Sequence, residues 1–265
     1  MNRLLCLLLL FAVSVRADEV ANAGRAILKK HQDAVVGVKI VAKVALPGRE
    51  STQEIKVDTI GMTVDATGLT VASLRNVEPG ELLSRVAGRD LQAEITDIKI
   101  VLADRSEIAA ALVLRDKDLD LAFLRPTEKL PKPASVISLT AAAKPELLDN
   151  VIVLSRSTRT PRLEPVLCDA RIAAIVDKPR LFYLGTAALQ NNSPGSAVFA
   201  LDGRFIGQLL LRRTTKGETW GVIIPAADIA DIAKQAPAEA PKPAAPTEEK
   251  KPVAPQGTNS TSSTR

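Results

Sequence analysis

The sequence is poor in cysteine, histidine and aromatic residues. Its 265 residues include two cysteines, one histidine and only 3% aromatics. Cys6 lies in the first, apolar stretch of the chain, so a chain cleaved after that stretch keeps Cys168 alone and cannot form an internal disulfide. Because Cys168 is surrounded by apolar residues, we expect a small buried side chain rather than a reactive thiol.

The single histidine leaves little room for histidine-based catalysis. His31 lies at the end of a segment, residues 20–33, whose apolar spacing predicts a short helix with Lys29, Lys30 and Gln32 facing outward. No sequence near His31 resembles a catalytic partner. We therefore interpret His31 as a solvated or helix-capping residue.

Long hydrophobic runs are also scarce. The one candidate, Leu4 to Val13, follows Arg3 and is too short to span a bilayer, and Val15-Arg16-Ala17 fits a small-residue cleavage site. This pattern is typical of a signal peptide over residues 1–17. We expect the mature chain to be exported, to a periplasmic or extracellular location, with no membrane span after cleavage.

The charge balance gives no basis for nucleic-acid binding. Removing Arg3 and Arg16 leaves 33 basic and 30 acidic residues, a net charge of only +3, and a nucleic-acid-binding face would need clustered basic residues. Residues 235–265 are rich in proline, alanine and Ser/Thr and contain only Val253 among the large aliphatic residues. Such a segment cannot bury a core, so we predict a disordered tail.

Between these ends, alternating apolar residues predict a series of short strands. The clearest are residues 34–46, 54–64, 98–102, 112–114 and 121–124 in the first half, and 149–155, 163–176, 181–184, 197–200 and 205–211 in the second. Asp202-Gly203 predicts a hairpin turn between the last two. Ala226–Lys234 has the pattern of a closing helix.

The segment GTAALQNNSPGSAVFALDGRFIG, residues 185–207, resembles the nucleophile loop of trypsin-fold serine endopeptidases, most closely those of the HtrA/Do-like branch. Aligned from both flanks, the resemblance places Pro194 at the nucleophile, followed by Gly195 and Ser196 where the family has two glycines. Proline has no hydroxyl, and it has no N–H to serve as an oxyanion donor. The resemblance therefore implies an inactive site.

Two further segments resemble the same family. In DATGLTVASLRNV, residues 65–77, Arg75 stands where the family has its general-base histidine, and a guanidinium cannot accept a proton at working pH. Residues 95–126 match the strands that lead to the catalytic aspartate and place Asp120 there. The resemblance implies that Arg75 and Asp120 face each other, so we expect a bidentate ion pair between them.

The resemblance implies an all-β fold, a trypsin-like double antiparallel β-barrel with a short N-terminal helix and a C-terminal helix. Residues 18–130 would hold the N-terminal helix and the first barrel, and residues 131–234 the second barrel and the C-terminal helix. We expect no PDZ domain of the kind common in HtrA-like proteins. We expect no cofactor and no metal ion.

Two functions remain open. The first is a non-catalytic protein that binds a peptide or protein or acts as a regulator. The second is a serine endopeptidase that uses a displaced serine, Ser196 or Ser193, although neither has an evident base. The ligand would be acidic if the loop cations converge on the cleft rather than lying as solvated charges at loop tips. These cations are Arg156, Arg159, Arg162, Arg212, Arg213 and Lys216.

Overall fold

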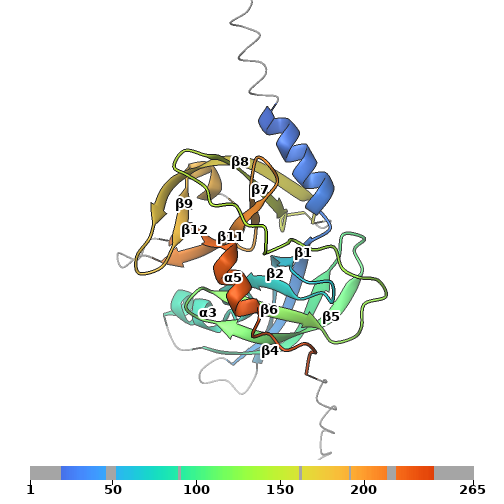
Figure 1. Ribbon diagram of the computed structural model, residues 1–265. Helices are drawn as coiled ribbons and strands as arrows, with labels where there is room; N and C mark the ends of the chain where they lie inside the picture. The colour runs from blue at the N-terminus through green and yellow to red at the C-terminus, as the bar shows by residue number, and fades with distance from the viewer. Residues whose placement is uncertain are drawn as a thin grey trace, which may run out of the picture.

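Twelve strands in the described part of the chain form two closed, six-stranded antiparallel barrels (Figure 1). The structure is a computed structural model that describes residues 19–45, 52–88, 91–160, 163–190, 192–213 and 219–241. The all-β fold with two antiparallel β-barrels expected from the sequence is confirmed.

The first barrel follows the order β1-β2-β3-β6-β5-β4. Its strands alternate between buried and exposed residues where one face meets solvent, and the central β6 is buried throughout. The strands are β1 (Val35–Ala45), β2 (Thr52–Thr63), β3 (Thr70–Ser73), β4 (Gln92–Val101), β5 (Glu107–Asp116) and β6 (Leu121–Pro126). Two helices lie between β3 and β4, the one-turn α2 (Leu74–Val77) and α3 (Gly80–Ala87).

The second barrel follows the order β10-β11-β12-β9-β8-β7. Its strands are β7 (Asn150–Arg156), β8 (Pro165–Val176), β9 (Phe182–Gly185), β10 (Ala197–Ala200), β11 (Phe205–Arg213) and β12 (Thr219–Pro225). The one-turn helix α4 (Ala187–Gln190) lies before β10. Gly203, with a φ of 82°, occupies the predicted turn between β10 and β11.

One apolar cluster joins the two barrels. It includes Met62 and Phe123 from the first barrel and Phe199 and Leu210 from the second, all buried. Ile27 of the N-terminal helix belongs to the same cluster. Each barrel also has a separate cluster inside it. The contact between the barrels is therefore a continuous part of the core.

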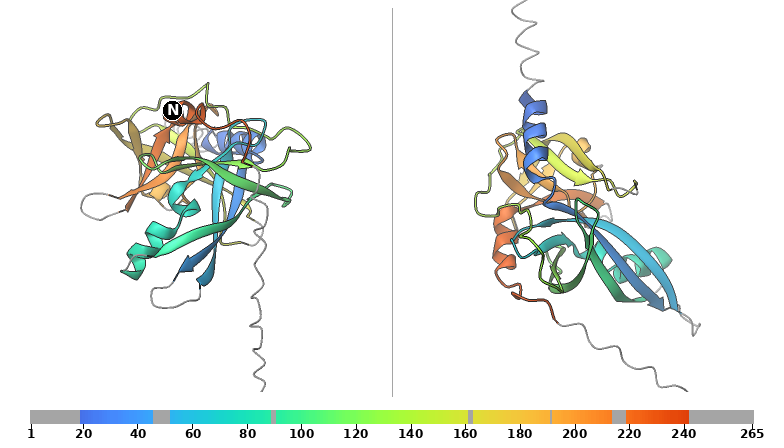
Figure 2. Two further views of the ribbon diagram at one scale, coloured as in Figure 1. Left: turned by 90° about the horizontal axis from the view of Figure 1, so that it is seen from below. Right: turned by 90° about the vertical axis from the view of Figure 1, so that its right-hand side faces the viewer.

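Helices occupy both ends of the described chain. The N-terminal helix spans residues 19–31, and α5 (Ala226–Ala233) lies at the junction of the two barrels (Figure 2). Among the described residues, no helix has the length and apolar character needed to cross a membrane. The predicted signal peptide, residues 1–17, lies outside the described residues.

The predicted disordered tail was placed too early. Residues 235–241 continue from α5 along the first barrel, where Ala236 packs against the shared core and Pro241 lines a groove between β4 and β5. Proline and alanine offer little apolar surface, but their side chains lose almost no rotamer entropy when the segment becomes ordered. The rest of the predicted tail, residues 242–265, lies outside the described part.

Candidate functional site

Asp120 is the centre of a buried polar cluster on the first barrel. The residue is 5% exposed and directly precedes β6, with a φ of 62°, a conformation that aspartate tolerates better than most residues. Ser73 Oγ donates to Oδ2 at 2.8 Å, and the Arg75 backbone N–H donates to Oδ1 at 2.9 Å. The Asp120 carbonyl accepts from the Leu74 N–H at 3.0 Å. Asp120 therefore fixes the start of α2.

The side chains of Arg75 and Asp120 do come together, but not as the expected bidentate pair. Arg75 Nε lies 4.0 Å from Asp120 Oδ1, and the arginine side chain is 33% exposed. Each Asp120 carboxylate oxygen already accepts one hydrogen bond, Oδ2 from Ser73 Oγ and Oδ1 from the Arg75 backbone N–H. The ion pair between Arg75 and Asp120 is therefore long and partly exposed to solvent.

Burial raises the pKa of the Asp120 carboxyl above its usual value. The hydrogen bonds from the Arg75 backbone and Ser73, and the positive charges of Arg75 and Arg212, offset part of this rise. Arg212 comes from β11 of the second barrel, and its guanidinium also donates to the Asp118 carbonyl. The cluster around Asp120 thus draws on both barrels.

The loop of residues 192–196 packs tightly on the first barrel. Gly195 has a φ of 98°, and a Cβ added there would lie 2.2 Å from the Ile60 carbonyl oxygen of β2. The buried Gln208 Nε2 donates to the Gly195 carbonyl at 3.1 Å and to the Val71 carbonyl of β3 at 2.9 Å. Only glycine fits this close approach.

These contacts bring the Pro194 loop close to α2. Asn76, the residue after Arg75, donates from Nδ2 to Thr59 Oγ1 at 2.9 Å, and Thr59 precedes the residue whose carbonyl abuts Gly195. The segments that hold Arg75, Asp120 and Pro194 therefore meet at the junction of the barrels.

The two serines beside Pro194 differ in exposure. Ser196 is 0% exposed, and its Oγ hydrogen-bonds to the Ser193 carbonyl at 2.6 Å and to Ser155 Oγ at 3.0 Å. Ser193 is half-buried. The Ser196 hydroxyl therefore holds the loop closed on β7, and a substrate could reach it only after the loop opens.

His31 is buried, so its interpretation as a solvated or capping residue was wrong. Its ring stacks on Phe199 of β10, with centroids 4.8 Å apart, and both ring nitrogens lack a hydrogen-bond partner among the described residues. Burial, and secondarily the charge of Lys30, lowers its pKa. His31 is thus a neutral core residue that joins the N-terminal helix to the second barrel.

The loop cations separate into structural and site residues. Arg156 is buried, and its guanidinium donates to the carbonyls of Val35, Gln32 (2.6 Å) and Leu163 (2.9 Å), so it holds the start of β1 instead of facing a cleft. Arg159 is exposed, and Arg212 reaches the Asp120 cluster. Arg162 and Lys216 lie outside the described residues, and so does the side-chain environment of Arg213.

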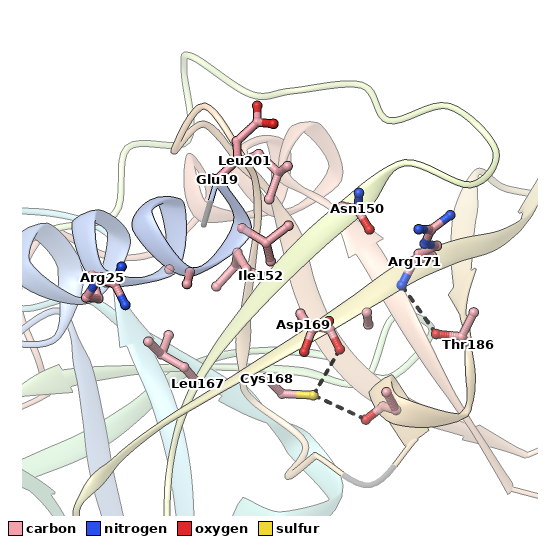
Figure 3. A pocket seen from close by; sticks show the side chains of 15 residues that line it. Glu19, Arg25, Asn150, Ile152, Leu167, Cys168, Asp169, Arg171, Thr186 and Leu201 are labelled. Carbon is pink, nitrogen blue, oxygen red and sulfur yellow. Dashed lines mark hydrogen bonds between the residues drawn. The ribbon is translucent and has the colours of Figure 1, made fainter. Parts of the chain in front are cut away.

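Cys168 is half-buried rather than fully buried. It lines a pocket of about 1010 Å³ between the N-terminal helix and the β7–β8 face (Figure 3). The thiol hydrogen-bonds to the carbonyls of Asp169 at 3.3 Å and Ala188 at 3.7 Å. Ile152 and Leu167 provide an apolar wall, while Arg25 and Arg171 lie at the edges.

Two closed barrels joined by a shared core, with the Asp120 cluster and the Pro194 loop meeting at their junction, define a trypsin-like protease-type fold. The sequence model of the trypsin-like peptidase domain matches residues 61–207, more than half of the chain. The chain belongs to the trypsin-like peptidase domain family. No curated protein matches the chain.

Proposed function

We propose that this chain is an exported, HtrA-like member of the trypsin-like family that has lost peptidase activity and binds a peptide or protein. The observation that carries the proposal is the environment of Asp120. Where the family resemblance places a histidine that would face this aspartate, the chain has Arg75. Arginine stays protonated and cannot take a proton from a nucleophile.

The second barrel supports the same proposal. Pro194 occupies the position of the nucleophile in the resemblance. Ser196, two residues later, is buried, and its hydroxyl is hydrogen-bonded to the Ser193 carbonyl and to Ser155 Oγ. The only histidine of the sequence, His31, is stacked on Phe199 within the core. Neither Ser196 nor Ser193 therefore has an available imidazole to act as its base.

Export is the part of the proposal that rests on sequence alone. Residues 1–17 have the pattern of a signal peptide, with Arg3 before an apolar run and a small-residue cleavage site. We propose that the chain acts in a periplasmic or extracellular space, and that it requires no cofactor.

Fluorophosphonate labelling tests the loss of activity. We expect no labelling of the mature protein, because removing the catalytic groups of a serine protease costs about 10⁶ in turnover. An active trypsin-fold protease labelled in the same tube serves as the positive control. Labelling that disappears in Ser196→Ala or Ser193→Ala would instead establish a peptidase with a displaced nucleophile.

A further inference from the structure

The first barrel has an opening in its wall between β4 and β5. Although each strand has ten residues, β4 pairs with β5 only at Lys99–Val101, opposite Glu107–Ala109. Beyond that point β4 remains paired with β1, and β5 with β6. The two strands leave their common turn and separate towards α3 (Figure 2, left). Residues 92–98 and 110–116 thus present two open strand edges.

Two adjoining pockets fill this opening. One, of about 440 Å³, lies between the strands near Thr127 and Pro241. The other, of about 660 Å³, reaches Arg75 and Asp120. Ile95 of β4 and Arg115 of β5 line both pockets, so together they form one continuous groove, which we name the β4–β5 groove.

The β4–β5 groove has an apolar floor and a polar wall. Ile95, Ala110 and Leu112 pack against the cluster inside the first barrel, and their outer surfaces line the pockets. In a strand, alternate residues direct their N–H and C=O groups to each side, so both open edges offer unpaired backbone donors and acceptors. An extended peptide satisfies such groups and covers such a floor.

The charges at the Arg75 end of the groove favour an acidic residue in the ligand. Arg115 Nε pairs with Glu78 at 2.6 Å, and Arg75 faces Asp120. Among the described residues that line this end, Lys117 is the cation without a carboxylate partner. A carboxylate on the ligand would balance it.

The chain's own C-terminal segment is a poor occupant. It reaches the groove at Pro241, but four prolines follow between residues 242 and 255. Proline has no N–H to give to a strand edge, so this sequence cannot pair continuously with β4 or β5. A separate polypeptide fits the groove better.

We propose that the β4–β5 groove binds an extended peptide segment of a partner protein, which pairs as an added strand with one of the open edges and places an acidic side chain beside Lys117. This inference deepens the proposed binding function and rests on it, since it names where the peptide lies and what its chemistry is. It places the ligand on the wall of the first barrel.

Fluorescence anisotropy with the full mature chain tests the site. The probe is a fluorescein-labelled peptide of about eight residues, alternating valine and threonine, with two glutamates near one end. Lys117→Glu should weaken binding by about tenfold, because it replaces attraction with repulsion. Lys29→Glu makes the same change of charge on an exposed position of the N-terminal helix and should leave the affinity within about twofold. A version with lysines in place of the glutamates should bind more weakly.

Backbone pairing has its own readout. Two versions of the probe carry N-methyl groups on alternate residues, one version for each edge of the strand. At least one should bind more than about tenfold more weakly, because several hydrogen bonds are lost together. Equal affinity for both methylated versions, or equal effects of Lys117→Glu and Lys29→Glu, would overturn the proposal.

Three further outcomes of the binding experiment bear on the proposal: no binding, a dimer of the chain, and cleavage of the probe. No binding of the probe would overturn the proposal, and a dimer that Lys117→Glu dissociates would assign the groove to a second copy of the chain. Mass spectrometry of the bound probe separates this inference from the proposed function. A probe that binds in the groove but is cleaved in a fluorophosphonate-sensitive manner would contradict the loss of activity while supporting the groove.

Discussion

The two halves of the candidate site are held in place by different contacts. On the first barrel, Asp120 keeps a full set of hydrogen bonds from Ser73 and the α2 backbone, although the residue facing it is an arginine. On the second barrel, Ser196 and Gly195 hold the loop closed against β7 and β2. The difference teaches that a buried carboxylate organises the first-barrel half through hydrogen bonds, whereas close backbone packing and a serine hydroxyl organise the second-barrel half.

The closed loop gives the largest expected effect. Gly195→Ala should destabilise the protein by about 3 kcal/mol, because it combines a positive φ with a Cβ 2.2 Å from the Ile60 carbonyl. Gly88→Ala is the matched control, since Gly88 also has a positive φ but has open space around it. We expect a cost of about 1 kcal/mol there. If urea denaturation gave the same loss in free energy of unfolding for Gly195→Ala and Gly88→Ala, the loop would not pack on β2 as described.

A pH titration tests how the N-terminal helix is held to the second barrel. The pKa of His31 is lowered in the folded state, so the unfolded chain binds the extra proton first as the pH falls below about 6.5. The protein should therefore lose stability as the pH falls from 7.5 to 5. His31→Phe keeps the stacking on Phe199 and should remove this part of the pH dependence.

Thermal melts of the wild type and His31→Phe across this pH range provide the measurement. Parallel loss of stability in both proteins would mean that other groups cause it. A larger loss in the variant would contradict burial of the neutral imidazole.

The smallest effect is expected on the first barrel. A double-mutant cycle with Arg75→Met and Asp120→Asn should give a coupling of about 1 kcal/mol or less, because the side chains are 4.0 Å apart and the arginine is one-third exposed. Coupling of about 3 kcal/mol or more would instead indicate a desolvated, bidentate pair. Urea denaturation at low and high salt would measure it, with a weaker coupling at high salt.

Much of the fold could be predicted from local pattern. Alternation between apolar and polar residues located most strands to within a few residues, and Asp202-Gly203 identified a hairpin turn. Strands β4 and β5 begin six and five residues earlier than the apolar pattern predicted. The flanks of Asp120 were also informative, because its neighbours in the sequence form β6 and the turn before it. These features depend on interactions over a few residues.

The missed features depend on contacts between distant segments. The burial of His31 is set by Phe199, and the role of Arg156 by carbonyls more than one hundred residues earlier in the chain. The alternation of apolar and polar residues in β4 and β5 gives no indication that the two strands separate. Helix α3 was not predicted, since an eight-residue segment after Pro79 has too few turns to show a clear period.

The core that joins the barrels has a consequence for how the molecule unfolds. Gln208 of the second barrel is hydrogen-bonded to Val71 of the first, and Met62, Phe123 and Phe199 share one apolar cluster. Separating the barrels would expose this cluster to water and leave the buried Gln208 amide without its hydrogen-bond partner, so we expect neither half to fold stably by itself. The described body should melt in one cooperative transition, with the calorimetric and van't Hoff enthalpies equal.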